Sequence, residues 1–173
     1  MKILYTICFD NSRDKDRPYF DNIHDVITNC LISVVKQMDD KDEIVFFLDG
    51  DDPLDTINTI CKKYNVNYII KPFNNPVSKN LNKGCLMAKE CVSYINKNIT
   101  NEHELIYLCE DDYLHYNGSL DIIKEFLFKY PFYFCHPIDY PNLYENELPQ
   151  YHTNQYSEII ITKNRHWRSI KNT

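Results

Sequence analysis

Glycine is scarce in this chain, with 3 residues among 173. The sequence contains neither GxGxxG nor GxxxxGK[ST], the glycine-rich patterns that hold phosphates in dinucleotide-binding and P-loop proteins. Long apolar runs are also missing, since none approaches the roughly 20 residues that cross a membrane. Residues 1–5 lack the features of a secretion signal. These absences disfavour dinucleotide binding, P-loop hydrolysis and a transmembrane segment, and they predict a cytoplasmic protein.

Positive charge is in short supply as well. The formal net charge is -6, which argues against a general nucleic-acid binder because such proteins usually present a basic face. An acidic protein still binds phosphorylated ligands when a metal ion or a local basic patch offsets the charge. The seven cysteines include no CxxC pair, and most of them lie in apolar runs. This pattern favours buried, reduced thiols over disulfides or a zinc site.

Apolar residues are plentiful, and their spacing alternates between two periods. Short continuous apolar runs predict strands at residues 3–9, 44–48, 66–70, 105–109, 132–135 and 158–162. Apolar positions three and four residues apart predict amphipathic helices at 23–38, 54–64, 81–95 and 120–130. Four alternations of strand and helix predict a single α/β domain over residues 1–173, with a mostly parallel central sheet and helices on both faces. Residues 137–156 show neither period and predict a loop or lid.

Acidic side chains follow four of these predicted strands, among them Asp10 after the first and Asp139 after the fifth. Glu110, Asp111 and Asp112 come directly after the fourth strand, and Asp49 and Asp51 follow the second. Ligands of open α/β sheets bind beyond the carboxyl ends of the strands, where these carboxylates would repel one another without a cation. Oxygen ligands favour Mn²⁺ or Mg²⁺, which keep positions for substrate phosphates.

In extended backbone, alternate side chains point the same way, so Glu110 and Asp112 are expected on one side and Asp111 on the other. A solvated acidic turn is the alternative for this triplet. For Asp49 and Asp51 the alternatives are a tight turn or a hydrogen bond from a base N–H. Asp52, in contrast, is expected to cap the helix that begins beside Pro53.

Cationic residues lie at two further places. Lys79 and Lys83 accompany the start of the third helix, where backbone N–H groups and the helix dipole favour an anion. Arg165 and Arg168 flank His166, so the arginines are candidates for a diphosphate clamp and a neutral histidine for a metal ligand. The alternatives are an ordinary solvated helix start and a cationic segment packed on the surface.

The order of these segments resembles the GT-A glycosyltransferases, in particular the family-2-like group. The resemblance rests on residues 3–6, 47–51, 82–84 and 107–113. It implies a hexosyltransferase that binds a nucleotide sugar, with uridine as the expected base, through Mn²⁺ or Mg²⁺ at a DxD-type motif. The residues that it implies are Thr6 and Asp49 near the nucleobase, Asn82 and Lys83 near the ribose or diphosphate, and Asp112 as the main metal ligand.

The resemblance also implies a catalytic base in the region after the fifth strand of an inverting enzyme. Asp139 and Glu158 are the candidates, with His152 behind them, and the base would take the proton of a glycan or other hydroxyl acceptor. Residues of about 1–115 would form the nucleotide-sugar part. The acceptor-side part, about 116–173, is shorter than usual in the family, so an oligomer or a partner chain is an expectation.

Two other functions stay open. One is a shortened, non-catalytic GT-A-like domain that binds a nucleotide or a partner protein. The other is a sugar nucleotidyltransferase, which normally needs a glycine-rich loop after the first strand. Residues 10–17 contain three cationic side chains but no glycine.

Overall fold

The computed structural model describes residues 2–9, 23–49, 53–73, 83–100, 103–111, 113–131, 135, 159–163 and 166–168. Its contacts divide the chain into two compact units, Met1–His115 and Tyr116–Thr173. The assignment of a nucleotide-sugar part and an acceptor-side part to these two stretches stays a prediction.

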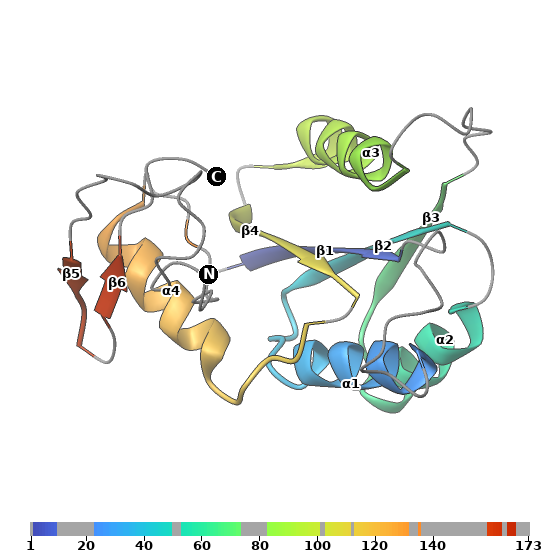
Figure 1. Ribbon diagram of the computed structural model, residues 1–173, viewed down its shortest axis with the longest axis horizontal. Coiled ribbons are helices and arrows are strands. Elements are labelled where there is room, and N and C mark those ends of the chain that lie inside the picture. The colour runs from blue at the N-terminus through green and yellow to red at the C-terminus, as the bar shows by residue number, and fades with distance from the viewer. Residues whose placement is uncertain are drawn as a thin grey trace, which may run out of the picture. The chain divides into compact units, whose positions relative to one another are not determined.

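The first unit is built on a four-stranded parallel sheet. Its strands are β1 (Lys2–Phe9), β2 (Glu43–Leu48), β3 (Tyr68–Pro72) and β4 (His103–Glu110), in the order β3-β2-β1-β4. Figure 1 shows the helices α1 (Ile23–Val35) and α2 (Leu54–Lys63) on one face of the sheet and α3 (Lys83–Asn98) on the other. The predicted α/β class, with a mostly parallel sheet and helices on both faces, is confirmed.

Burial falls from the centre of the sheet to its edge, as the sequence pattern requires. β1 and β2 are continuous apolar runs, and five successive residues of β2 are buried. Edge strand β3 is only partly buried along its length. A strand with neighbours on both sides and helices on both faces has no solvent-facing positions, so it lacks the polar alternation of a half-exposed strand.

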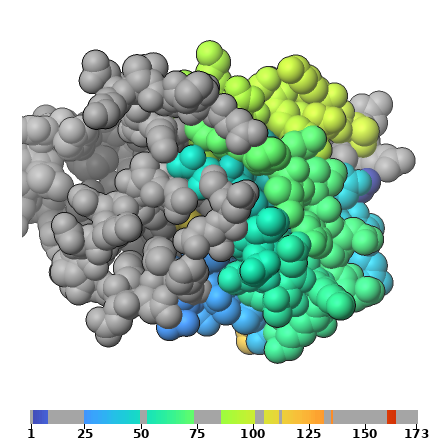
Figure 2. All heavy atoms as spheres, turned by 90° about the vertical axis from the view of Figure 1, so that its right-hand side faces the viewer, coloured from blue at the N-terminus to red at the C-terminus, as the bar shows by residue number. Residues whose placement is uncertain are grey.

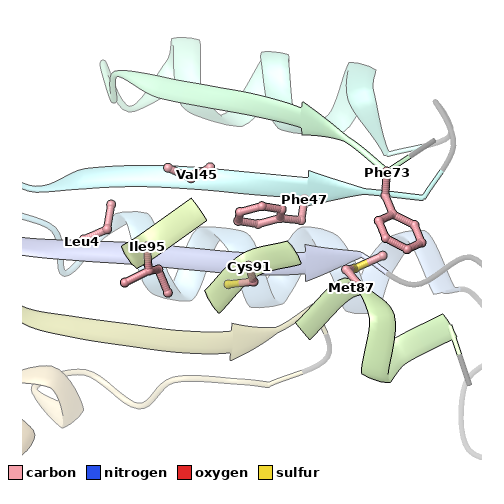
Figure 3. Close-up of a cluster of buried hydrophobic side chains, with 7 residues drawn as sticks. All are labelled: Leu4, Val45, Phe47, Phe73, Met87, Cys91 and Ile95. Atoms are coloured by element: carbon pink, nitrogen blue, oxygen red, sulfur yellow. The ribbon is translucent and has the colours of Figure 1, made fainter. Parts of the chain in front are cut away.

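The core between the sheet and α3 also shows the direction of that helix (Figure 3). Seven buried side chains make up this cluster: Leu4, Val45, Phe47, Phe73, Met87, Cys91 and Ile95. Met87 lies near Phe73 at the carboxyl end of the strands, whereas Ile95 lies near Leu4 towards the amino end (Figure 3). α3 therefore runs antiparallel to the strands and begins at the carboxyl end of the sheet. Each such apolar side chain contributes about 1.5–3 kcal/mol when fully buried.

The start of β3 differs from the prediction, because the chain uses the preceding residues to end α2. Asn65 has φ 54, and the N–H groups of Asn65 and Val66 donate to the carbonyls of Lys62 and Cys61 at 3.3 and 2.9 Å. This pair of bonds is a Schellman motif, which satisfies carbonyls that the helix end leaves unpaired. Val66, expected in the strand, thus belongs to the turn.

The start of α2 also differs in one detail. Pro53, expected in the first turn, takes the N-cap position, and its carbonyl accepts the N–H of Ile57 at 3.0 Å. The predicted cap residue Asp52 lies outside the described residues.

The second unit contains α4 (Ser119–Lys129) and a two-stranded antiparallel sheet of β5 (Ile159–Ile161) and β6 (His166–Arg168). The backbone N–H of Lys163, in the turn between these strands, donates to Glu125 Oε1 of α4 at 2.8 Å. The last predicted strand was at residues 158–162, so the sequence did not predict β6, which pairs with β5. β6 has only three residues, of which two are polar, so it shows no apolar run or alternation from which a strand could be predicted. Most of the predicted strand at 132–135 and the predicted loop at 137–156 lie outside the described residues.

Candidate functional site

The carboxyl ends of three strands lie side by side in the first unit. Cys8 of β1 pairs with Phe47 of β2 on one side and with Glu110 of β4 on the other. Asp49 follows β2 directly and is half-buried. Neighbouring strands are about 4.8 Å apart, so the backbones of β2 and β4 are separated by about 10 Å across β1. The structure therefore brings Asp49 and Glu110 to the same end of the sheet.

Two consecutive acidic side chains of the predicted metal motif differ in exposure. Glu110 is exposed, whereas Asp111 is 2% exposed. Glu110 is the last residue of β4, and Asp111 already lies in the turn that follows it. Asp112 lies outside the described residues. Of the two carboxylates of the motif that the structure describes, Glu110 is the one that a ligand can reach from solvent, and its oxygens suit Mn²⁺ or Mg²⁺.

The start of α3 lies at the same end and on the same side of the sheet as Glu110. Cys8 packs against the core cluster beneath α3, and a residue paired in register with it points to the same face. α3 begins at the carboxyl end of the strands (Figure 3), so its first N–H groups lie at the same end of the sheet as Glu110, the last residue of β4. Lys83 is the first residue of α3.

Thr6 lies inside the sheet rather than at its edge. It is 1% exposed, and its hydroxyl donates to the carbonyl of Tyr107 at 3.3 Å. Three further residues of β1 separate it from the carboxyl end. The described contacts of Thr6 are therefore contacts of the core, and its role near a nucleobase stays a prediction.

Several predicted site residues fall outside what the structure describes. In β6, His166 and Arg168 are described only as backbone. The remaining ones are Asp51, Lys79, Asn82, Asp112, Asp139, His152, Glu158 and Arg165.

The pKa values of two thiols on the α3 face, Cys8 and Cys91, are shifted in opposite directions. A hydrogen bond with Cys91, followed by burial, raises the pKa of Cys8 far above its usual range, and the charges of Asp111 and Glu110 raise it further. The same bond, assisted by one from Thr6, lowers the pKa of Cys91 to about 7. Carboxylates thus act on a group inside the sheet, and a bound cation would offset their field.

A polar network that sequence reasoning missed follows the acidic motif. The backbone N–H of His115 donates to Ser33 Oγ at 3.0 Å, and Nδ1 of its ring lies 3.2 Å from the same oxygen. Nε2 lies 2.7 Å from the hydroxyl of Tyr107. Burial lowers the pKa of His115. The network ties the segment after the motif to α1, and no local pattern could reveal it because Ser33 and His115 are 82 positions apart.

A groove of about 390 Å³ opens beside α3. Figure 2 shows the side of the first unit on which α2, β3 and α3 reach the surface. The groove is lined by Phe47, Lys71, Pro72, Phe73, Glu90, Ser93, Tyr94 and Lys97. Lys71 Nζ lies 5.1 Å from the centroid of the Tyr94 ring, within cation–π range. Neither Asp49 nor Glu110 lines this groove.

Ligands of open α/β sheets bind beyond the carboxyl ends of the strands, and here that end carries carboxylates and the start of a helix. The model of glycosyl transferase family 2 matches residues 18–172. This match spans most of the sequence, so the chain belongs to glycosyl transferase family 2 and is a glycosyltransferase of the GT-A type. Comparisons with curated proteins and with solved structures gave no match. Among the described residues, no helix has the length and apolar character that a membrane crossing requires.

Proposed function

We propose that the chain transfers a sugar, a hexose, from a nucleoside diphosphate sugar to an acceptor hydroxyl, with Mn²⁺ or Mg²⁺ at the acidic motif. The nucleotide is proposed to be uridine-linked. The observation that carries the proposal is the exposed carboxylate of Glu110 at the carboxyl end of the parallel sheet. The chain is a family 2 glycosyltransferase, and an oxygen ligand at this edge would hold a cation and, through it, a diphosphate.

The metal ligands of the proposal are Asp112, Glu110 and His166. Asp112 is the principal ligand by family resemblance, and the exposure of Glu110 supports the second assignment. When bound, the cation supplies positive charge against the charge that develops on the departing diphosphate. Asp111, which is 2% exposed, is proposed as a donor ligand because it lies within the acidic motif. Its burial means that a direct donor contact requires the motif to rearrange.

The other proposed donor ligands come from several segments of the chain. Asp49 and Asp51 are proposed to accept hydrogen bonds from the base, with Thr6 also near it. The start of α3 binds the diphosphate, since its N–H groups and dipole favour an anion. The cationic and amide side chains assigned to the ribose or diphosphate are Lys79, Asn82, Lys83, Arg165 and Arg168.

Catalysis also requires a base on the acceptor side. Asp139 and Glu158 are the proposed bases, and either would take the proton of the acceptor hydroxyl as it attacks the anomeric carbon. Holding the acceptor hydroxyl close to the anomeric carbon of the donor supplies much of the rate enhancement in such transfers.

A thermal-shift screen of nucleotide sugars, with and without Mn²⁺, tests the proposal. A ligand that binds only the folded state stabilises it by about 2.7 kcal/mol at 100 times its Kd. We expect one uridine nucleotide sugar to raise Tm in the presence of Mn²⁺ and to lose most of this effect with chelator. If no nucleotide sugar raises Tm with either metal, the proposal is wrong.

A donor-hydrolysis assay separates transfer from binding alone. A glycosyltransferase with Mn²⁺ and no acceptor slowly releases free sugar from its donor, because water replaces the acceptor hydroxyl. Tight donor binding without release of sugar, even with a panel of acceptors, would indicate a non-catalytic binding domain instead.

A further inference from the structure

Behind the acidic motif, two buried thiols and a buried imidazole converge on one point. Cys30 comes from α1, Cys109 from β4 and His115 from the segment after the motif. Their exposed fractions are 2%, 7% and 9%. One ligand atom from each, the two Sγ atoms and a ring nitrogen, lie within 4.8 Å of one another. We propose that Cys30, Cys109 and His115 bind one Zn²⁺ ion, at a site separate from the donor site.

The spacing suits a shared tetrahedral ion. Zn–S bonds of about 2.3 Å and Zn–N bonds of about 2.0–2.1 Å place a sulfur and a nitrogen ligand about 3.5 Å apart. Cys109 Sγ lies 3.9 Å from His115 Nε2. A movement of a few tenths of an ångström therefore brings these two atoms to the distance that a common ion requires.

Hydrogen bonds fix which nitrogen of His115 presents its lone pair to the thiols. The hydroxyl of Ser33 gives its one proton to the carbonyl of Cys30 at 2.7 Å. Ser33 Oγ, which lies 3.2 Å from Nδ1, therefore accepts the Nδ1 proton. Nε2 is then the unprotonated nitrogen and points to the Tyr107 hydroxyl and to Cys109. Histidines that bind metals usually donate their other ring N–H to a partner in this way.

The chemistry of the ligands selects the ion. Two thiolates and one imidazole favour zinc over the Mn²⁺ or Mg²⁺ that carboxylates prefer. Both thiols donate to the carbonyl of Glu110, at 3.5 Å for Cys30 and 2.9 Å for Cys109. Binding of Zn²⁺ releases these two thiol protons, so the site of two thiolates and one dication is neutral. A neutral cluster avoids the cost of a buried net charge.

The fourth ligand is one of two oxygens beside the cluster, the Glu110 carbonyl or the Tyr107 hydroxyl. The Glu110 carbonyl lies beside both sulfurs, and the Tyr107 hydroxyl lies 2.7 Å from Nε2. Leu114, next to His115, is 65% exposed, so the ligand segment lies close to the surface and gives an ion a short entry path. The bound ion would join α1 to the end of β4 directly behind the acidic motif.

Cobalt substitution of the full chain tests the site. The reduced, chelator-treated protein is titrated with Co²⁺, which reports tetrahedral coordination through intense visible bands and thiolate ligands through a near-ultraviolet charge-transfer band. We expect one Co²⁺ per chain with both signals, displacement by Zn²⁺, and a higher Tm with Zn²⁺. Absence of the thiolate band, or a Cys30–Cys109 disulfide in the protein as purified, would overturn the proposal.

Matched variants assign the ligands. Cys109→Ser and His115→Gln should each lose most of the thiolate and tetrahedral signals, whereas Cys61→Ser should keep them. Cys61 is a similarly buried thiol on α2. Burial raises the pKa of this thiol to about 11. Asp112→Ala should also keep both signals, which separates this site from the donor metal site. If the signals persist in Cys109→Ser, or disappear in Asp112→Ala, the three residues are not the ligands.

Cadmium NMR of the unmodified chain covers the case in which a variant fails to fold. The chemical shift of bound cadmium increases with the number of thiolate ligands. A single resonance in the range of two thiolates and one nitrogen is expected. A resonance typical of oxygen ligands alone would contradict the assignment without any substitution.

Discussion

The carboxylates at the two ends of the parallel sheet differ in exposure and in hydrogen bonding. At the amino end Asp42 is 7% exposed, and its two oxygens accept the backbone N–H groups of Ile3 and Asp39, each at 2.9 Å. At the carboxyl end Glu110 is exposed. Both oxygens of Asp42 are therefore occupied by hydrogen bonds that connect the turn before β2 to β1. The carboxylate of Glu110 is accessible to a ligand. Backbone donors thus occupy both oxygens of the carboxylate at one end, whereas the carboxylate at the other end is accessible to solvent.

The largest effect is expected at the carboxyl end. Asp112→Ala should abolish metal-dependent donor binding, by at least about 100-fold in Kd, which is about 2.7 kcal/mol. The fold should remain intact, which an unchanged Tm without ligand would show. Titration calorimetry with a uridine nucleotide sugar and Mn²⁺ measures the loss. Asp40→Ala, at an exposed acid in the turn at the opposite end, is the control and should bind as the unmodified chain does.

The next effect is expected at the amino end and on stability alone. Asp42→Ala leaves the N–H groups of Ile3 and Asp39 without their acceptor, and each unsatisfied buried group costs about 1–3 kcal/mol. We expect the free energy of unfolding in urea to fall by about 2–4 kcal/mol. Asp42→Asn keeps one acceptor oxygen and should lose less. Equal losses in the two variants, or a loss below about 0.5 kcal/mol, would show that the carboxylate does not hold this turn.

A smaller effect should come from backbone geometry without any change of polar group. Gly118, the N-cap of α4, has φ 79, and a Cβ there would meet no atom within 4 Å. Gly118→Ala should therefore cost only the left-handed backbone conformation, about 1–2 kcal/mol in the free energy of unfolding. Gly118→Asn should cost less, because asparagine tolerates this conformation better. A destabilisation beyond about 3 kcal/mol would mean that the position is crowded.

The smallest effect is expected from an ion pair beside Asp42. Lys2 Nζ lies 2.7 Å from Glu43 Oε1, with side chains 20% and 46% exposed. Exposed pairs of this kind contribute about 0.2–1 kcal/mol. Lys2→Met should therefore change the free energy of unfolding by less than Asp42→Ala does, and a double-mutant cycle with Glu43→Gln isolates the pair. A coupling energy above about 2 kcal/mol would mean that the exposed carboxylate of Glu43 stabilises this end of the sheet as strongly as the buried carboxylate of Asp42.

The elements of the first unit were predictable because local periodicity reports them. β1, β2 and β4 are apolar runs between helices with apolar faces, and helix crossovers between such strands imply parallel pairing. The position of Glu110 at a strand end followed from the same pattern. Val66 was misplaced because the hydrogen bonds that end α2 outweighed its preference for a strand.

Contacts between distant positions could not be predicted from local pattern. Asp42 belongs to an acidic run after the first predicted helix. Its partner Ile3 is 39 positions away, so local pattern does not reveal the contact. Cys30 and Cys109 appeared to be ordinary buried thiols, since their spacing matches no metal motif. Only the fold brings them to His115. Such sites depend on tertiary packing, which a single sequence does not display.

The most direct test of the central claim is calorimetric titration of the unmodified chain with uridine diphosphate, in Mn²⁺ and then in chelator. The carboxyl end of the sheet is proposed to bind the diphosphate through a cation held by Glu110 and Asp112. We therefore predict one binding site per chain in Mn²⁺ and a loss of at least about 10-fold in affinity, about 1.4 kcal/mol, in chelator. Equal affinity under both conditions would contradict the account.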